Sequence, residues 1–184
     1  MKHYFYNTFA YSTIEEHLFV AKYAIDTQKS SERNSCYGMP AFVLLSSVID
    51  IIGTVYSNGL FKSITKEQVA KKNGLGYCRE HFEDYYNKFI KDIGLCSEKE
   101  FIDCFYNQSR CLATHNGIIG LTVCLTIKEA PDGCFIKKVG KKTTIYLKQL
   151  YSIVNESYEV MKKESGLLPP QDIFGPTTGN TIDN

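Results

Sequence analysis

Arg110 and His115 are the two residues whose types and spacing could support chemistry in this chain. They lie five positions apart, where an apolar-patterned segment ends at Gly117. The C-terminus of a helix carries partial negative charge, which favours a protonated imidazole and keeps histidine able to exchange protons near neutrality. A guanidinium nearby can bind a phosphate through paired hydrogen bonds. Together these groups fit metal-independent RNA cleavage, in which a base activates the ribose 2′-OH and a cation stabilises the phosphorane.

The spacing of this pair sets a geometric condition. Residues five apart on a regular helix are separated by roughly 140° around its axis, so Arg110 and His115 would not share a face. Unwinding of the last turn, or a second subunit, must bring such groups together, and cleavage would then leave a cyclic phosphate. The alternative is structural: Arg110 pairs with a carboxylate and His115 caps its own helix.

The Arg110-x4-His115 pattern at a helix end resembles the Arg-x4-6-His motif of the HEPN superfamily, whose members are helical bundles. The resemblance covers roughly residues 12–115 and the last helix, and the chain is also similar to bacterial proteins that share the Ile49-Asp50 pair. It implies a metal-independent endoribonuclease, often a toxin or antiviral factor, in which two protomers form one cleft with Arg110 and His115 as catalytic residues. Cys111 stands where active members often carry a polar residue. The competing hypothesis is therefore a non-catalytic HEPN-like module that binds a nucleotide, RNA or a protein partner.

Two further polar residues could support the pair. Asp50 interrupts the most apolar segment of the chain, and a buried carboxylate needs hydrogen bonds or a cation. Arg110 is one candidate partner, in which case Asp50 orients the guanidinium, while the alternative is that Asp50 faces solvent or caps a loop. Asn116 follows His115 directly, and we assign it a supporting role beside the catalytic histidine.

A lysine-rich segment suggests a local contact with nucleic acid. Lys137, Lys138, Lys141 and Lys142 lie in a predicted hairpin, where they could contact phosphates. Lysines on exposed hairpins also prevent edge-to-edge pairing, so a structural role is the alternative. The formal net charge of the whole chain is only +1, which excludes a global field that would select polyanions.

The cysteines predict neither disulfides nor a metal site. Their number is seven, which is odd, and no two of them form a CxxC pair. This pattern favours reduced thiols. Cys78 and His81 are the closest approach to a metal half-site, but no second pair of ligands follows at suitable spacing. We therefore expect neither a metal nor another cofactor.

The patterning predicts a mainly α fold: an up-and-down bundle of four to five helices, with a small hairpin or three-strand insertion at about residues 121–147 before the last helix. Ser12 and Glu15, like Ser97 and Glu100, have the spacing of a capping box, which predicts helix starts at Ser12 and Ser97. The other predicted helices are a proline-led one to about Tyr56, a short one at 65–72, one at 79–93 closed by Gly94, and a last one carrying Leu150, Val154 and Met161.

The chain of 184 residues has the size of one domain, and we expect residues 1–184 to form one, with an extended tail at 166–184. Its start lacks the apolar run of a secretory signal, and the apolar segment 41–55 is interrupted by polar residues and predicts a core helix. The sequence thus predicts a soluble cytoplasmic protein without a membrane contact, with RNA or a nucleotide as a possible ligand, a second copy of the chain as a homodimer partner, and a further protein partner as an alternative.

Overall fold

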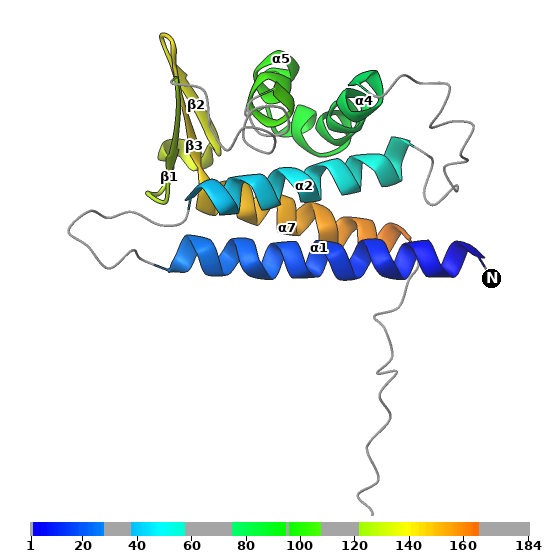
Figure 1. Cartoon of the computed structure of the whole chain (residues 1–184). Helices are drawn as coiled ribbons and strands as arrows, with labels where there is room; N and C mark the ends of the chain where they lie inside the picture. Colours follow the sequence, from blue (N-terminus) through cyan, green and yellow to red (C-terminus); the bar gives the residue numbers. More distant parts are fainter. Residues whose placement is uncertain (1, 28–37, 58–74, 95, 108–121, 166–184) are drawn as a thin grey trace, which may run out of the picture.

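The protein is mainly helical and carries one small sheet, as the computed structural model shows for residues 2–27, 38–57, 75–94, 96–107 and 122–165 (Figure 1). The predicted mainly α class is therefore confirmed. The helices are α1 (Lys2–Asp26), α2 (Gly38–Ser57), α4 (Leu75–Tyr85), α5 (Glu98–Ile102) and α7 (Leu147–Glu164). The strands are β1 (Val123–Thr126), β2 (Ile136–Val139) and β3 (Lys142–Tyr146).

Two helices continue in other helical forms. α4 runs on through a π-helical turn at Tyr86–Ile90 and a 3-10 turn at Lys91–Ile93. α5 runs on through a π-helical turn at residues 103–107. The position of the predicted closing glycine is confirmed, because Gly94 has a φ of 64° and so adopts the left-handed conformation that ends a helix.

The central element is α2, which contacts α1, α4 and α7. Figure 1 shows α1, α2 and α7 lying side by side, with α4 and α5 over the other side of α2 and the sheet at one end. α1 and α2 run in opposite directions. α2 and α7 run in the same direction, since Tyr56 near the end of α2 donates a hydrogen bond of 2.8 Å to Glu164 at the end of α7.

The core is rich in aromatic rings. Phe101 of α5 lies between rings from α4 and its own helix, with centroid distances of 5.9 Å to Tyr85 and 4.7 Å to Phe105. Phe135, which precedes β2, also packs against Phe105 at 6.1 Å. Offset and tilted rings at these distances attract one another beyond their burial. Sheet and helices therefore share one continuous core.

The sheet has the strand order β1-β3-β2. β2 and β3 form the predicted hairpin and turn at Gly140, which has a φ of 60°. β1 pairs in parallel with β3 from Val123 to Thr126, a pairing that strand propensity alone does not reveal. β3 passes directly into α7 at Leu147, so the last helix begins earlier than the predicted apolar face from Leu150.

Two predicted helix starts have different outcomes. The capping box at Ser97 is confirmed: its hydroxyl accepts from the backbone of Glu100, whose carboxylate accepts from the backbone of Ser97 at 3.0 Å. The start at Ser12 is wrong, because α1 begins ten residues earlier and Ser12 lies inside it with its hydroxyl 3.5 Å from Glu16. The predicted start at Arg79 is also late, since α4 begins at Leu75. The predicted helix at 65–72 and tail at 166–184 lie outside the described residues.

Among the described residues, α2 is the one helix with the length and hydropathy of a membrane span, and half of its apolar window is buried inside the protein. It is longer than the apolar segment 41–55 on which the prediction rested. Eight of its residues are buried, including Phe42, Leu45 and Ile52. This burial agrees with the predicted core helix.

Candidate functional site

The predicted site residues fall into two groups. Arg110, His115 and Asn116 lie outside the described residues. Asp50 and the four hairpin lysines lie within them. The described chain approaches the motif through α5 and its π-helical turn, which ends at Asn107, three positions before Arg110 in the sequence.

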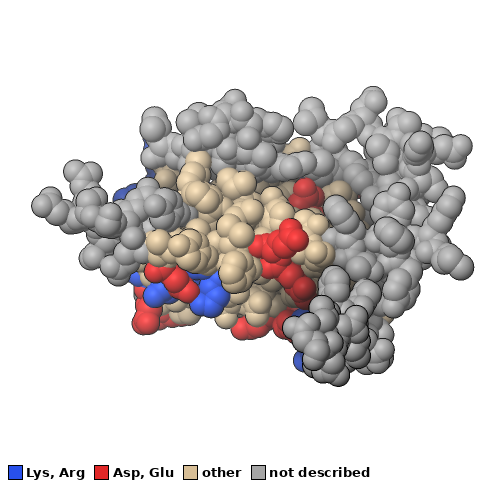
Figure 2. All heavy atoms as spheres, turned by 60° about the horizontal axis from the view of Figure 1, so that its bottom comes forward, with Lys and Arg blue, Asp and Glu red and all other residues tan. Residues whose placement is uncertain are grey.

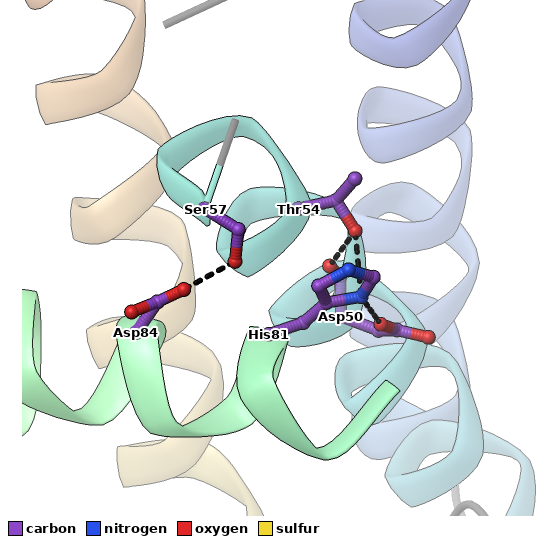
Figure 3. Close-up of polar contacts among 5 residues, drawn as sticks. All are labelled: Asp50, Thr54, Ser57, His81 and Asp84. Carbon is purple, nitrogen blue, oxygen red and sulfur yellow. Dashed lines mark hydrogen bonds and ion pairs between the residues drawn. The ribbon is translucent and has the colours of Figure 1, made fainter. Parts of the chain in front are cut away.

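Asp50 faces α4 and pairs there with His81. The Oδ1 atom of Asp50 lies 2.7 Å from Nδ1 of His81, and the side chains are 17% and 8% exposed. The predicted need of this carboxylate for a partner is therefore met by a histidine of α4. Figure 3 shows the two side chains meeting between the helices.

Thr54 completes this contact and fixes the orientation of the imidazole. Its hydroxyl donates to the backbone carbonyl of Asp50 at 2.7 Å, one turn earlier on α2, and lies 2.9 Å from Nδ1 of His81. A carboxylate accepts hydrogen bonds, so the ring carries its proton on Nδ1, which donates toward both oxygens (Figure 3). In the neutral ring the accepting nitrogen is then Nε2.

Gly53 explains how His81 comes so close to α2. A Cβ atom at Gly53 would lie 2.0 Å from the carbonyl oxygen of His81 and 2.6 Å from its carbonyl carbon. Only a residue without a side chain allows this approach of the two backbones. The glycine in this apolar helix thus sets the distance at which Asp50 reaches the ring of His81.

A second polar contact extends the row toward the end of α2. The hydroxyl of Ser57 donates to Asp84, one turn beyond His81 on α4 (Figure 3). We refer to these residues together as the α2–α4 polar seam: Asp50, Thr54, Ser57, His81 and Asp84. The seam runs from the buried contact at His81 to the exposed one at Ser57.

The seam can do two things chemically. A carboxylate that holds Nδ1–H of a histidine leaves Nε2 as a base, the arrangement that orients histidine for proton transfer in many enzymes. The same contact also satisfies two polar groups between packed helices. Since both side chains are mostly buried, its direct effect is to fix α4 against α2.

The four hairpin lysines, Lys137, Lys138, Lys141 and Lys142, are exposed, as a phosphate-binding surface requires. Lys138 lies near the start of α5. Hydrogen bonds from the backbone and hydroxyl of Ser97 lower the pKa of Glu100, and the ammonium of Lys138 contributes to the same shift. The basic hairpin thus lies beside the helix that leads to Arg110 in the sequence.

Cys96 and Cys104 are unsuited to nucleophilic chemistry. Burial raises the pKa of both Cys96 and Cys104 to about 12, so these thiols stay protonated at neutral pH. Cys124 and Cys134 are also free. Within the described ranges no three metal-ligating side chains gather. His81, which the spacing to Cys78 made a candidate for a metal half-site, directs Nδ1 to Asp50.

His81 is the residue that sequence reasoning missed as a partner of Asp50. One signal could have pointed to it. A carboxylate in an apolar helix needs a cation or a donor, and histidine is one of the few side chains that supply it in a mostly buried position. Gly53, one turn from Asp50, marks where another helix can approach.

Comparison of the chain with known protein families, with curated proteins and with solved structures found no match.

Proposed function

We propose that this protein is a metal-independent endoribonuclease of the HEPN type, in which Arg110 and His115 act on RNA within a homodimer. One observation carries the proposal: the Arg110-x4-His115 pattern follows directly on a helical segment of a mainly helical protein. Such a pair supplies a proton-transfer group and a fixed cation, which are the two functions that metal-free cleavage needs. A role in the cell interior as a toxin or defence factor follows from the same resemblance.

The proposed reaction is an internal transfer at phosphorus. His115 removes the proton of the ribose 2′-OH, whose oxygen attacks the adjacent phosphorus as the bond to the 5′-oxygen breaks. Arg110 stabilises the negative charge that gathers on the phosphoryl oxygens. A histidine of the second copy returns a proton to the leaving 5′-oxygen. The products are a 2′,3′-cyclic phosphate and a free 5′-hydroxyl.

Two described features support this proposal. The exposed lysines of the β2–β3 hairpin offer positive charge beside α5, where an RNA backbone would pass. The α2–α4 polar seam fixes α4, which packs against α5 through Tyr85 and Phe101 at 5.9 Å. A rigid scaffold behind a catalytic segment is what accurate positioning of a proton-transfer group requires. Asn116 would support His115 from the neighbouring position.

The test is cleavage of a varied RNA pool by the purified protein in the presence of a chelator. We expect fragments that end in 2′,3′-cyclic phosphates, and a loss of roughly a hundredfold or more in rate for Arg110→Ala and for His115→Ala. Intact RNA, or cleavage by His115→Ala at the rate of the unchanged protein, would contradict the mechanism.

Matched controls are available on described helices. Arg79→Ala removes an exposed guanidinium that pairs along its own helix, α4, with Glu83 at 2.8 Å. His17→Ala removes a histidine from α1, where its ring contacts the carbonyl of Thr13 at 2.7 Å. Both variants should cleave at the unchanged rate. If they lose activity equally, the loss in the Arg110 and His115 variants reflects general damage.

The second candidate function is a non-catalytic module that binds RNA, and the exposed hairpin lysines favour it. It predicts binding without cleavage. Each phosphate contact with a single strand contributes roughly 0.7 to the slope of log affinity against log salt, so replacing Lys137, Lys138, Lys141 and Lys142 with alanine should reduce that slope by up to about 3. If these replacements leave the RNA affinity unchanged, the hairpin is not an RNA-binding surface in either candidate function. The remaining ligands of a binding module would then be a nucleotide or a protein.

A further inference from the structure

The outer face of α1 carries large apolar side chains in water. Phe19 is 74% exposed and Tyr23 is 64% exposed, and they lie one turn apart on the same face, with Val20 beside them at 46%. They lie opposite the buried row of α1: Ile14, Leu18, Ala21 and Ile25. α1 therefore has one face in the core and a second apolar patch turned away from it.

The size of this patch points to a docking surface. Aromatic side chains present roughly 150–250 Å² each, so the three residues expose about 350 Å² of apolar surface in one copy. Continuous apolar patches of this extent on soluble proteins are commonly functional. Two such patches meeting would supply about half of the roughly 1,200 Å² found in small specific interfaces, with the polar rim of the helix providing the rest.

Charged side chains of both signs flank the patch, so opposite charges can meet when two copies of the chain pair through it. Figure 2 shows the uncharged surface on this face with acidic and basic side chains next to it. Glu15 and Lys22 are both exposed and are seven residues apart, which is two helical turns, so they lie on the same flank of α1. Phe19 lies between them along the helix.

If two copies pair about a two-fold axis at Phe19, the same contact between opposite charges forms twice. In two antiparallel helices related by such an axis, the same flanks face each other, and residues before the centre in one copy meet residues after it in the other. Glu15 then meets Lys22 of the partner subunit, and the reverse pair forms on the other side of the axis. On the opposite flank Glu16 meets Tyr23 of the partner subunit, whose hydroxyl can donate to the carboxylate.

Glu15 and Lys22 each have a contact within their own chain, and these contacts still allow the two side chains to pair between two copies. Glu15 accepts a hydrogen bond of 2.7 Å from Tyr158 of α7 through Oε1, which holds its carboxylate in place. Lys22 pairs at 2.6 Å with Asp26, and both of these side chains are more than half exposed. An exposed pair of this kind contributes little, so the ammonium can turn to a partner at small cost.

We propose that the outer face of α1 is an interface between two copies of this chain, paired antiparallel about Phe19. This face of α1 lies on the far side of α2 from α4 and α5 (Figure 1).

Sedimentation velocity of the full chain, from low micromolar to hundreds of micromolar, tests the interface. We expect a concentration-dependent association that weakens roughly tenfold or more in Phe19→Ser/Tyr23→Ser. The matched control is Val139→Ser, which removes an apolar side chain that is 68% exposed on the hairpin, and it should associate as the unchanged protein does. Circular dichroism checks that each variant is folded.

Charge reversal tests the register. Lys22→Glu and Glu15→Lys should each weaken self-association, because like charges then meet across the axis. An equimolar mixture of the two variants should associate again, since each contact in the mixed pair joins opposite charges. This rescue has no explanation in damage to the fold.

Three results would overturn the proposal: a monomer at every concentration, association unaffected by Phe19→Ser/Tyr23→Ser, or failure of the mixed variants to associate. The first would also be the outcome if residues 166–184 of the same chain occupied the patch. Association that is unaffected by Phe19→Ser/Tyr23→Ser, or failure of the mixed variants to associate, would overturn the α1 interface and leave the nuclease proposal standing. A monomer at every concentration would count against both, because the proposed nuclease acts as a homodimer, and loss of RNA cleavage alone would leave the α1 interface standing.

Discussion

Gly53→Ala is the substitution whose effect the packing of α2 against α4 defines most directly. The added Cβ would lie 2.0 Å from the carbonyl oxygen of His81, whereas ordinary contacts of such atoms are at roughly 3.4 Å or more. The obstacle is backbone, so no side-chain rotation relieves it. These two atoms must move apart by about 1.4 Å to reach ordinary contact, so the helices separate and the contact between Asp50 and His81 lengthens.

The expected magnitude combines two destabilising effects with one stabilising effect. Forcing extra volume into a packed contact costs about 1–3 kcal/mol, and the broken polar contact of His81 adds about 1–2 kcal/mol. Alanine recovers about 1 kcal/mol through its higher helix propensity. The net loss in the free energy of unfolding is about 2 kcal/mol, or a fall in Tm of roughly 4–8 °C for a chain of this length.

Thermal and urea unfolding followed by circular dichroism measure this loss. Ser152→Ala is the matched control, because it adds helix propensity at an exposed position of α7 and should change the Tm little. A Gly53→Ala protein as stable as the unchanged one, or more stable, would show that the backbones of α2 and α4 do not approach so closely. Close packing at Gly53 would then not be the reason that His81 reaches Asp50.

Two other predictions concern the polar contacts. Asp50→Ala should lower the free energy of unfolding by about 2 kcal/mol, because it leaves a mostly buried donor of His81 without its carboxylate, and Asp50→Asn should restore most of this through its amide oxygen. Asp84→Ala, at the exposed end of the seam, should cost less than about 0.5 kcal/mol. Urea unfolding measures both losses, and an equal loss in the two alanine variants would contradict this ranking. Ser97→Ala should cost about 1 kcal/mol near neutral pH through loss of the capping box. Since Ser97 lowers the pKa of Glu100, the stabilisation is present above the ordinary glutamate pKa of roughly 4.3 and is lost as the pH falls through the lowered value, so the deficit of Ser97→Ala should shrink in acid; a deficit independent of pH would contradict it.

Much of the fold follows from local patterns, and its errors have local causes. Ser97 and Ser12 both begin an S/T-x-x-E spacing, but only Ser97 follows a glycine-terminated helix, so only there is the chain free to start a new one. At Ser12 the helical pattern simply continues from α1, and its hydroxyl contacts Glu16 instead. The same spacing therefore identifies a helix start only where the preceding residues end another element.

Contacts between distant segments could not be predicted in this way. The position of Asp50 in an apolar helix predicts that its carboxylate needs a partner. That the partner is His81 depends on how α4 crosses α2 at Gly53. The parallel pairing of β1 with β3 likewise depends on the tertiary path, since strand patterns do not record direction. The four hairpin lysines were expected on an exposed hairpin, and their side chains are exposed.

The direct passage from β3 to α7 has a consequence for how this protein can vary. With no connecting residue between Tyr146 and Leu147, the register of the sheet sets the angular phase of the last helix. One residue inserted there would rotate α7 by about 100° and turn its buried row, Leu150, Val154 and Met161, toward water. Insertions and deletions should therefore be tolerated at the Gly140 turn. Between Tyr146 and Leu147 the number of residues has to stay the same, so that β3 and α7 both keep their apolar side chains in the core.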